Sequence, residues 1–224
     1  MLHRRQILKS GVAAAAVAAV GTPLAWAETA ASKADGAALN KLFDQFMKEN
    51  LDMSPVGATF LGIDTGARAK QRGEIDDNSL AGYQKNKELI SSQLQRLNAF
   101  DAKSLTGMDE LNYEIVQYGL QIQDGDDKKY DYGGEGAGAP YIVSQLTGTY
   151  QQFPDFLASQ QPVENKDDAE YYLQRLDGVG TALDRDSEVA RHDVALGVIP
   201  PDFALDKALT QMAALRNVDA GKSV

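Results

Sequence analysis

Residues 165–197, NKDDAEYYLQRLDGVGTALDRDSEVARHDVALG, decide the fold class. Asn165 is a suitable N-cap, and the acidic residues that follow it lie in the first turn, where they favour the helix dipole. Apolar residues then recur at helical spacing as far as Gly197: Tyr172, Leu173, Leu176, Leu183, Val189 and Val194. The stretch therefore predicts one long amphipathic helix.

The same apolar spacing recurs on both sides of this helix. It predicts further helices over these residues: 37–47, 55–61, 80–100, 109–122, 142–150 and 201–215. The connection between the helices at 80–100 and 109–122 is short, so we expect these two to pair as an antiparallel hairpin. No segment shows the strict alternation of a strand, and the expected fold is all-α, with amphipathic helices packed as hairpins.

Local signals predict where the helices begin and end. Ser54 before Pro55, Asn78 or Ser79, and Thr106 or Asp109 are suitable first residues. Residues 64–77 are rich in charge and poor in apolar residues, so they predict an exposed loop. Five glycines and five acidic residues between residues 124 and 140 predict the end of any helix there. We expect a further turn to begin at Pro154.

The first residues of the chain have the features of an export signal. Residues 3–11, HRRQILKSG, precede an alanine-rich apolar run, and Ala25-Trp26-Ala27 then offers a cleavage point before Glu28. The run is too short to span a bilayer, which takes roughly 20 apolar residues. The motif resembles a twin-arginine signal, carried by Arg4, Arg5, Leu8 and Lys9.

This interpretation predicts the organisation and location of the chain. Residues 1–27 are the signal, 28–36 a disordered linker and 37–224 a helical domain. The expected partner during export is the twin-arginine translocase, the expected location is the periplasm, and no membrane anchor remains after cleavage. General secretion, or a basic helix that belongs to the fold, are the alternatives.

The composition of the remaining 197 residues excludes several classes of partner and site. Without the signal, the chain has 19 basic against 32 acidic residues, which disfavours binding to nucleic acid or to anionic lipid. The sequence contains no cysteine, so it has no disulfide and no cysteine zinc site. The length favours a single domain with a core of ordinary size.

The residues alone predict no catalytic or metal site. Glu188 and His192 share a helix face and could offer two ligands, but a solvated surface shared with Arg185 and Arg191 explains them better. Residues 124–127 lack the acid spacing of a calcium loop.

The glycine-rich segment at residues 133–138 follows no strand and lacks the lysine of a phosphate-binding loop. Most tyrosines fall at helical spacing, which indicates packing. Tyr141, beside the glycine-rich segment, is the one that we expect to contact a ligand.

Several stretches occur in the order found in a bacterial family. They are FMKENLDMSPVGATFLGID (46–64), LTGMDELNYEIVQYGL (105–120), YIVSQLTGTYQQFPDFL (141–157), DDAEYYLQRLDGV (167–179) and GVIPPDFALDKALTQM (197–212). On these stretches the chain resembles the N-terminal part of the family catalogued as domain of unknown function 885 (DUF885). The resemblance covers nearly all of residues 40–216.

The resemblance implies a larger helical, metallopeptidase-like fold and an exported zinc peptidase. In that family a His-Glu-x-x-His helix in the C-terminal half binds zinc, and its glutamate activates water. This sequence has no such motif, so no catalytic or metal-binding residue can be transferred to it. Zinc is expected for a full-length member and not for this chain, and a peptide is the expected substrate of the full-length protein.

Two interpretations of the chain stay open. It is the front portion of such a peptidase, as a fragment or a truncated reading frame, or it is a complete, non-catalytic helical binding or scaffold module. The coding sequence after Val224 distinguishes them. Truncation would also expose an apolar face on the last helix, around Phe203, Leu205, Leu209 and Met212.

Overall fold

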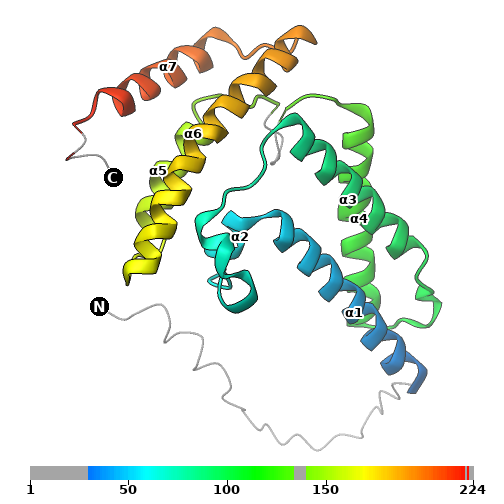
Figure 1. Ribbon diagram of the computed structural model, residues 1–224. Helices are drawn as coiled ribbons and strands as arrows, with labels where there is room; N and C mark the ends of the chain where they lie inside the picture. Colours follow the sequence, from blue (N-terminus) through cyan, green and yellow to red (C-terminus); the bar gives the residue numbers. More distant parts are fainter. Residues whose placement is uncertain (1–29, 134–139, 220, 222–224) are drawn as a thin grey trace, which may run out of the picture.

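The computed structural model describes residues 30–133, 140–219 and 221 (Figure 1). Every regular element within these ranges is a helix, which confirms the all-α prediction. No helix of the described ranges combines the length and the apolar character needed to cross a membrane. The predicted signal residues Arg4, Arg5, Leu8, Lys9, Ala25, Ala27 and Glu28 lie outside the described residues.

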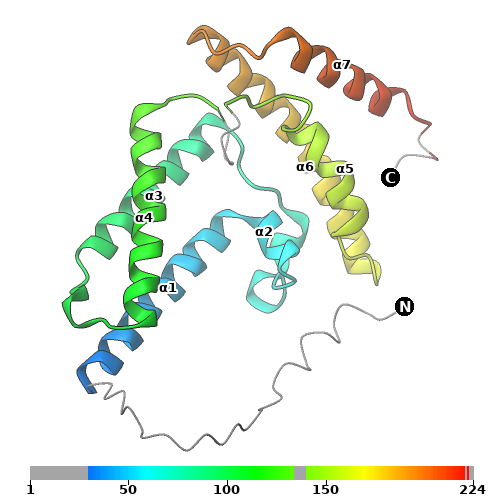
Figure 2. The same cartoon turned by 180° about the vertical axis from the view of Figure 1, so that it is seen from behind.

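The first half of the chain forms the main hydrophobic core. It is built from α1 (Ala30–Met53), α3 (Leu80–Asn98) and α4 (Met108–Lys129), with the short η3 (Ala102–Ser104) between the last two. Both ribbon views show α3 and α4 side by side, as the hairpin prediction requires (Figures 1 and 2). The buried members of the core are Leu39, Phe46, Ile90, Leu97, Leu105 and Leu120.

The second half consists of α5 (Thr149–Ser159), α6 (Lys166–Ala195) and α7 (Asp202–Asn217). α5 lies along α6, while α7 leaves the far end of α6 at an angle (Figure 1). A 2.8 Å contact between Tyr150 Oη and the side-chain amide of Gln211 joins α5 to α7.

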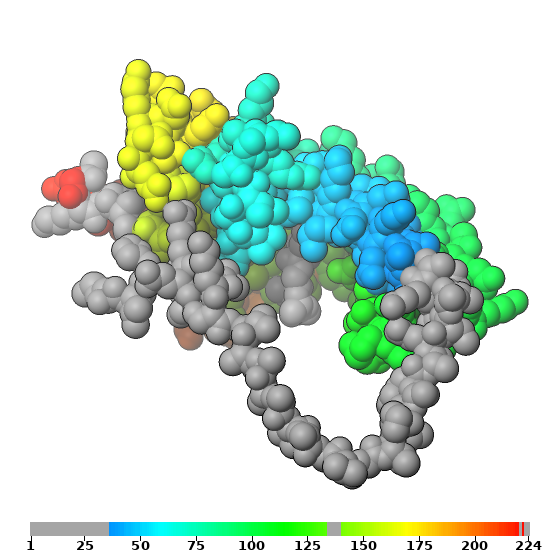
Figure 3. Space-filling view, turned by 90° about the horizontal axis from the view of Figure 1, so that it is seen from below, coloured from blue at the N-terminus to red at the C-terminus, as the bar shows by residue number. Residues whose placement is uncertain are grey.

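The two halves meet through α2 (Pro55–Phe60) and the 3₁₀ helix η2 (Gly66–Gly73). η2 packs against α2 and against the first part of α6, as the space-filling view shows (Figure 3). The contact is polar: Arg72 pairs with Asp64 and, at 2.5 Å, with Asp168 of α6. Residues 64–77 are therefore not the exposed loop that their charge predicts, because η2 forms within them and Asp64 and Arg72 are drawn into this contact.

Three predicted N-caps are confirmed. The side chains of Ser54, Ser79 and Asn165 each accept a hydrogen bond from a backbone N–H at the start of α2, α3 and α6, at 3.0 to 3.1 Å. The prediction for α4 is wrong. This helix begins at Met108, and its N-cap is Gly107 and not Thr106 or Asp109.

Two helices are longer than predicted. α1 begins at Ala30, so residues 30–36 are helical and the predicted linker does not extend over them. Gly36 is buried close to the Asp109 carboxylate of α4, so α1 and α4 approach each other closely at this position.

α4 continues to Lys129 through the acidic stretch that predicts its end. An ion pair between Lys128 and Asp124, 2.7 Å long and one turn apart, supports the last turns. The two final lysines also favour the negative end of the helix.

Two predictions around α5 are wrong. Residues 142–148 form a turn and not a helix, and Pro154 lies inside α5 without opening a new one. Tyr150 Oη donates to the carbonyl oxygen of Ser144 at 2.6 Å, which closes the turn against α5. Side-chain bonds thus replace the helical ones that the apolar spacing predicts.

α6 buries a polar face in place of the predicted apolar one. The predicted packing residues Leu173, Leu176, Leu183 and Val194 are 63%, 47%, 39% and 51% exposed. The buried residues of α6 are Asp168, Arg175, Ala182, Asp186, Val189 and Asp193. Because the neighbouring segments are themselves polar, α6 turns toward them the side chains that can pair with their groups.

Candidate functional site

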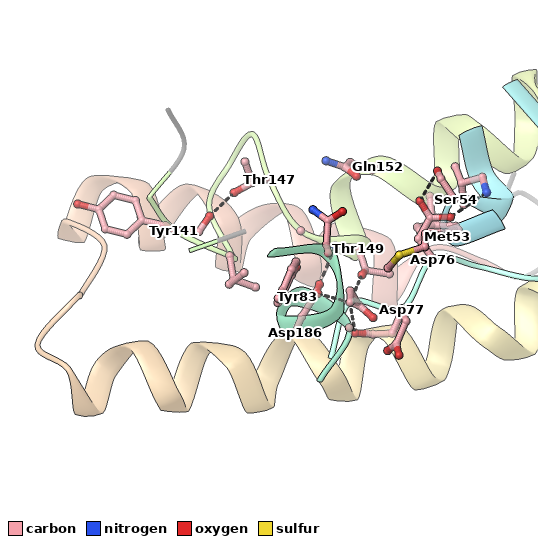
Figure 4. Close-up of a pocket in the computed structure, with 18 of the residues that line it drawn as sticks. Met53, Ser54, Asp76, Asp77, Tyr83, Tyr141, Thr147, Thr149, Gln152 and Asp186 are labelled. Atoms are coloured by element: carbon pink, nitrogen blue, oxygen red, sulfur yellow. Dashed lines mark hydrogen bonds between the residues drawn. The ribbon is translucent and has the colours of Figure 1, made fainter. Parts of the chain in front are cut away.

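A pocket of about 410 Å³ lies where the two halves of the chain meet (Figure 4). Its lining comes from the α1–α2 junction, residues 76–78, the start of α3, the turn before α5, α5 itself and the middle of α6. Segments far apart in the sequence therefore build it together. Its volume falls in the range of small-molecule sites, roughly 300 to 1,000 Å³.

Asn78 holds the centre of the site together. Its Nδ2 donates to Asp186 Oδ1 at 2.5 Å and to the carbonyl oxygen of Ala182 at 3.0 Å, both on α6. Thr149 Oγ1 lies 3.4 Å from the same nitrogen. Asp186 in turn accepts a 2.7 Å bond from the backbone N–H of Thr149, the first residue of α5. One amide and one carboxylate thus join α3, α5 and α6.

The oxygen of the Asn78 amide has no partner among the described residues although it is buried. The orientation of the amide is fixed, because the reverse orientation would set this oxygen against the oxygens of Asp186 and Ala182. Asn78 lines the pocket, but this oxygen is enclosed by the protein and does not face solvent.

Asp76 forms a second carboxylate of the pocket. Its Oδ2 accepts from Ser54 Oγ at 2.8 Å, and its Oδ1 accepts from the backbone N–H of Val56 at 2.9 Å. Burial raises the pKa of Asp76, and these two neutral donors and the more distant Arg175 only partly oppose that effect. Asp76 ties the start of α2 to the segment that carries Asn78.

The third carboxylate, Asp77, is exposed and paired with Arg185 at 3.2 Å. No lysine, arginine or histidine is among the described residues that line the pocket. Its polar lining is otherwise made of amides and hydroxyls, and Met53, Tyr83 and Phe153 add apolar surface. Apart from these three carboxylates, the polar groups of the lining are neutral.

The turn before α5 closes one side of the pocket. Thr147 Oγ1 donates to the carbonyl oxygen of Tyr141 at 3.0 Å, and Ser144 N donates to the Thr147 carbonyl oxygen at 3.3 Å. Gly148 follows with φ of +103°, a conformation open to glycine and costly for other residues. It turns the chain so that Thr149 N points at Asp186.

Tyr141, the residue predicted to contact a ligand, does lie in the pocket lining. Figure 4 shows its ring directed away from Asp76 and Asp186. Its backbone oxygen accepts from Thr147 Oγ1 within the turn before α5.

Arg175 anchors the adjoining polar contact and is fully buried. It donates to Gln161 Oε1, Thr59 Oγ1 and the backbone oxygens of Gln71 and Glu74. Burial lowers the pKa of Arg175 to about 10, and nearby carboxylates only partly oppose the shift. These bonds use four of its five N–H groups, and the side chain is fully buried, so Arg175 organises the structure.

The residues weighed as metal ligands do not converge. His192 Nδ1 lies 3.1 Å from Asp193 Oδ1, and its Nε2 lies 3.7 Å from Asp131 Oδ2, while Glu188 is exposed. His192 and Arg185 are partly buried beside carboxylates, whereas Glu188 and Arg191 are exposed, as the predicted solvated surface requires. In the described ranges no three histidine, cysteine or acidic side chains are arranged to hold a metal ion.

Sequence patterns do not identify Asn78, Asp76 or Asp186 as site residues. Asn78 is predicted only as a possible helix cap, Asp76 falls in the segment predicted to be an exposed loop, and no pattern singles out Asp186. One pattern in the sequence could have identified the buried face of α6. Asp168, Arg175, Ala182 and Val189 recur every seven residues and so share one helix face, and Asp186 lies on that same face.

A family model described as "Bacterial protein of unknown function (DUF885)" matches residues 55–223. The match spans α2 to α7 and includes every described pocket residue except Asn50, Met53 and Ser54. No curated protein and no solved structure matches the chain significantly.

Proposed function

The chain belongs to the DUF885 family, and from this we propose that it is the N-terminal, non-catalytic part of an exported zinc-dependent peptidase. Its helices would form one wall of a peptide-binding channel, with the pocket as a contact surface for the peptide. The zinc-binding His-Glu-x-x-His helix that the family resemblance implies is absent from this sequence. The ligands for zinc would therefore come from residues outside this sequence.

The chemistry of the pocket lining is the observation that supports peptide binding. A peptide backbone presents alternating N–H donors and C=O acceptors, and both need partners when they leave water. Side-chain amides supply a donor and an acceptor each, and Asn50, Asn86 and Gln152 line the pocket. Met53, Tyr83 and Phe153 offer apolar surface to the side chains of a peptide.

The described residues do not fit zinc by themselves, since His192 pairs with aspartates and has no second histidine beside it. This favours a second candidate, a non-catalytic periplasmic binding or scaffold protein, in which the same pocket binds peptides without cleaving them. The two candidates share the pocket and differ in whether the coding sequence continues to a metal site.

The peptide-binding proposal is tested with a library of fluorescent tetrapeptides and the purified chain. We expect binding without cleavage, and we expect Gln152→Arg to weaken it because the longer side chain enters the pocket. Gln151→Arg is the matched control, since this neighbour is also exposed but does not line the pocket. Absence of binding to any peptide would contradict the proposal.

Zinc analysis and the coding sequence test the non-catalytic part of the proposal. Stoichiometric, chelator-sensitive zinc in the purified chain would contradict it and return attention to Glu188 and His192. An in-frame His-Glu-x-x-His after Val224 supports the peptidase, and the same motif in another frame supports a truncated one. A coding sequence without the motif supports the binding or scaffold protein.

A further inference from the structure

α4 is apolar on two opposite sides, and within the described residues only one of them is covered. Its inner side packs into the main core through Tyr113, Val116 and Leu120. Its other side carries five large apolar residues, each between 45% and 67% exposed: Met108, Leu111, Ile115, Tyr118 and Ile122. We call these five residues the outer face of α4. Figure 2 shows α4 in front of α3, with no other described helix in front of it.

The spacing of the outer face is typical of a helix that packs against another element. Its residues recur at steps of three and four, so they form one row along the helix, about 21 Å from Met108 to Ile122. A helix that is apolar all round is normally covered all round, and a large exposed apolar patch marks an interaction surface. The outer face is therefore a docking surface, and its charge and position indicate what binds there.

The charge of α4 favours a basic occupant. The helix has six acidic and two basic residues, and two of the acidic ones adjoin the row. Asp126 follows Ile122 by one turn, and Glu114 lies next to Ile115. The formal net charge of the whole chain is −10, so a second copy of it would add negative charge to this surface. A basic apolar segment would instead be complementary in both charge and hydrophobicity.

Residues 1–27 of the same chain have this composition. They contain Arg4, Arg5 and Lys9 and no acidic residue. Residues 12–20 consist of alanine and valine alone, whose small side chains allow a close approach to another helix. The segment predicted to be the export signal is thus basic at one end and apolar along the rest.

The place where this segment joins the structure brings it to the outer face. α1 begins at Ala30, about 9 Å of helix before Gly36, and Gly36 lies close to Asp109 at the start of α4. Residues 21–29 span up to about 30 Å when extended, which is enough to turn back onto α4. In helical form residues 7–20 would be about 20 Å long, close to the length of the row.

We propose that residues 4–22 bind to the outer face of α4. The segment runs from the start of α4 toward its end, so that Arg4 and Arg5 lie beside Asp126 while residues 12–20 cover the apolar row. The signal then shields an apolar surface for as long as it stays attached, and its removal uncovers that surface. The inference concerns a different surface from the pocket and does not rest on the proposed function.

Disulfide cross-linking in the uncleaved 224-residue chain, made by cell-free synthesis, tests the proposal. The sequence has no cysteine, so two introduced cysteines can pair only with each other. Ala16→Cys is combined with Ile115→Cys on the outer face or, as the matched control, with Met47→Cys, which is 55% exposed on α1. The chain from residue 16 to residue 30 spans up to about 46 Å and can reach both positions.

We expect the Ala16 and Ile115 pair to cross-link within one chain at least about tenfold faster than the control pair, because docking raises the local concentration of the first pair alone. Equal rates would show that the segment has no preferred site and would overturn the proposal. Cross-links between two chains would show that a second copy covers the face, which also overturns it. Circular dichroism checks the fold, and Leu111→Cys on the same face replaces Ile115→Cys if that variant does not fold.

The choice of a basic occupant is tested in the same cross-linking pair. Arg4→Glu with Arg5→Glu reverses two charges and should slow the cross-link about threefold or more, since two favourable exposed pairs become repulsive. Arg4→Lys with Arg5→Lys keeps both charges, and this control should cross-link at the rate of the unmodified segment. A rate that does not change on charge reversal would overturn the complementarity on which the assignment of this occupant depends.

Discussion

Asn78 donates a hydrogen bond to Asp186 at 2.5 Å across 108 positions of the sequence. Asn78 lies just before α3, in the half of the chain that contains the main core, and Asp186 lies in the middle of α6 in the other half. The same amide also bonds to the Ala182 carbonyl oxygen. This pair therefore joins the two halves at the pocket.

Asn78→Ala should lower the free energy of unfolding by about 2 kcal/mol, because it leaves Asp186 Oδ1 and the Ala182 carbonyl oxygen without their donor. Urea denaturation measures the change. Asn217→Ala, at the exposed end of α7, serves as the control and should change stability by less than about 0.5 kcal/mol. Equal stability of the two variants would show that the pair is not a stabilising link.

Gly82→Ala should destabilise the chain and disturb the pocket. A Cβ atom at this position would lie 1.9 Å from the backbone oxygen of Asp77, in the segment that carries Asp76 and Asn78. That segment would have to move, and we expect a loss of about 2 kcal/mol or more. Gly119→Ala in α4 is the matched control, since a Cβ there meets no atom within 4 Å and removal of a helical glycine should stabilise by about 0.5 to 1 kcal/mol. The same sign of change in both variants would contradict the close approach seen at Gly82.

Features that depend on neighbouring residues were predictable from the sequence. The all-α class, the α3–α4 hairpin and the caps at Ser54, Ser79 and Asn165 follow from apolar spacing and from side chains that bond two or three residues ahead. The residues that make these interactions lie within one helical turn or one hairpin of each other, so a local sequence pattern predicts them.

The pocket was not predictable in the same way. Contacts in the pocket and in the adjoining polar contact join residues about 100 positions apart, such as Asn78 with Asp186 and Arg175 with the Glu74 backbone oxygen. Apolar spacing predicts that α6 packs through Leu173 and Leu176, yet the helix packs through polar residues whose partners lie on distant segments. A periodicity argument assigns polar residues to solvent and cannot identify a buried polar face whose partners are remote in sequence.

The export signal is tested by changing Arg4 and Arg5 together to lysine. We expect this change to abolish export of a fused reporter, because the twin-arginine pathway recognises the arginine pair. His3→Lys, which adds a charge outside the pair, is the control and should leave export intact. The amount of reporter in the periplasmic fraction measures export. Export that continues after the double substitution would favour general secretion.

The apolar surface of α7 should promote association. Phe203 and Leu209 are 65% and 64% exposed, whereas Leu205 and Met212, which were also predicted to lie on this face, are partly buried. We expect the chain to bind a hydrophobic dye and to associate as its concentration rises. Phe203→Ser with Leu209→Gln should reduce both effects, and Ala214→Gln, also exposed on α7, should not. A chain that stays monomeric and binds no dye would contradict this prediction.

Asp168→Asn should reveal how the polar contact between η2 and α6 depends on pH. Burial alone would raise the pKa of Asp168, but hydrogen bonds from the Glu164 N–H and from Arg72 outweigh it, and the pKa lies below its usual 3.8. A carboxyl whose pKa is lower in the folded state stabilises the fold above its unfolded pKa, and this contribution disappears as the pH falls through the folded pKa.

We therefore expect Asp168→Asn to cost about 3 kcal/mol at pH 7, because Arg72 loses one of its two partners at a partly buried contact. The difference from the unmodified chain should shrink as the pH is lowered below 3.8. Asp167→Asn changes the adjacent, exposed residue in the same first turn and should cost less than about 1 kcal/mol, through the helix dipole alone. Urea denaturation of the three proteins between pH 2.5 and pH 7 measures both effects, and a gap that stays constant with pH would show that the charge of Asp168 does not contribute to the contact.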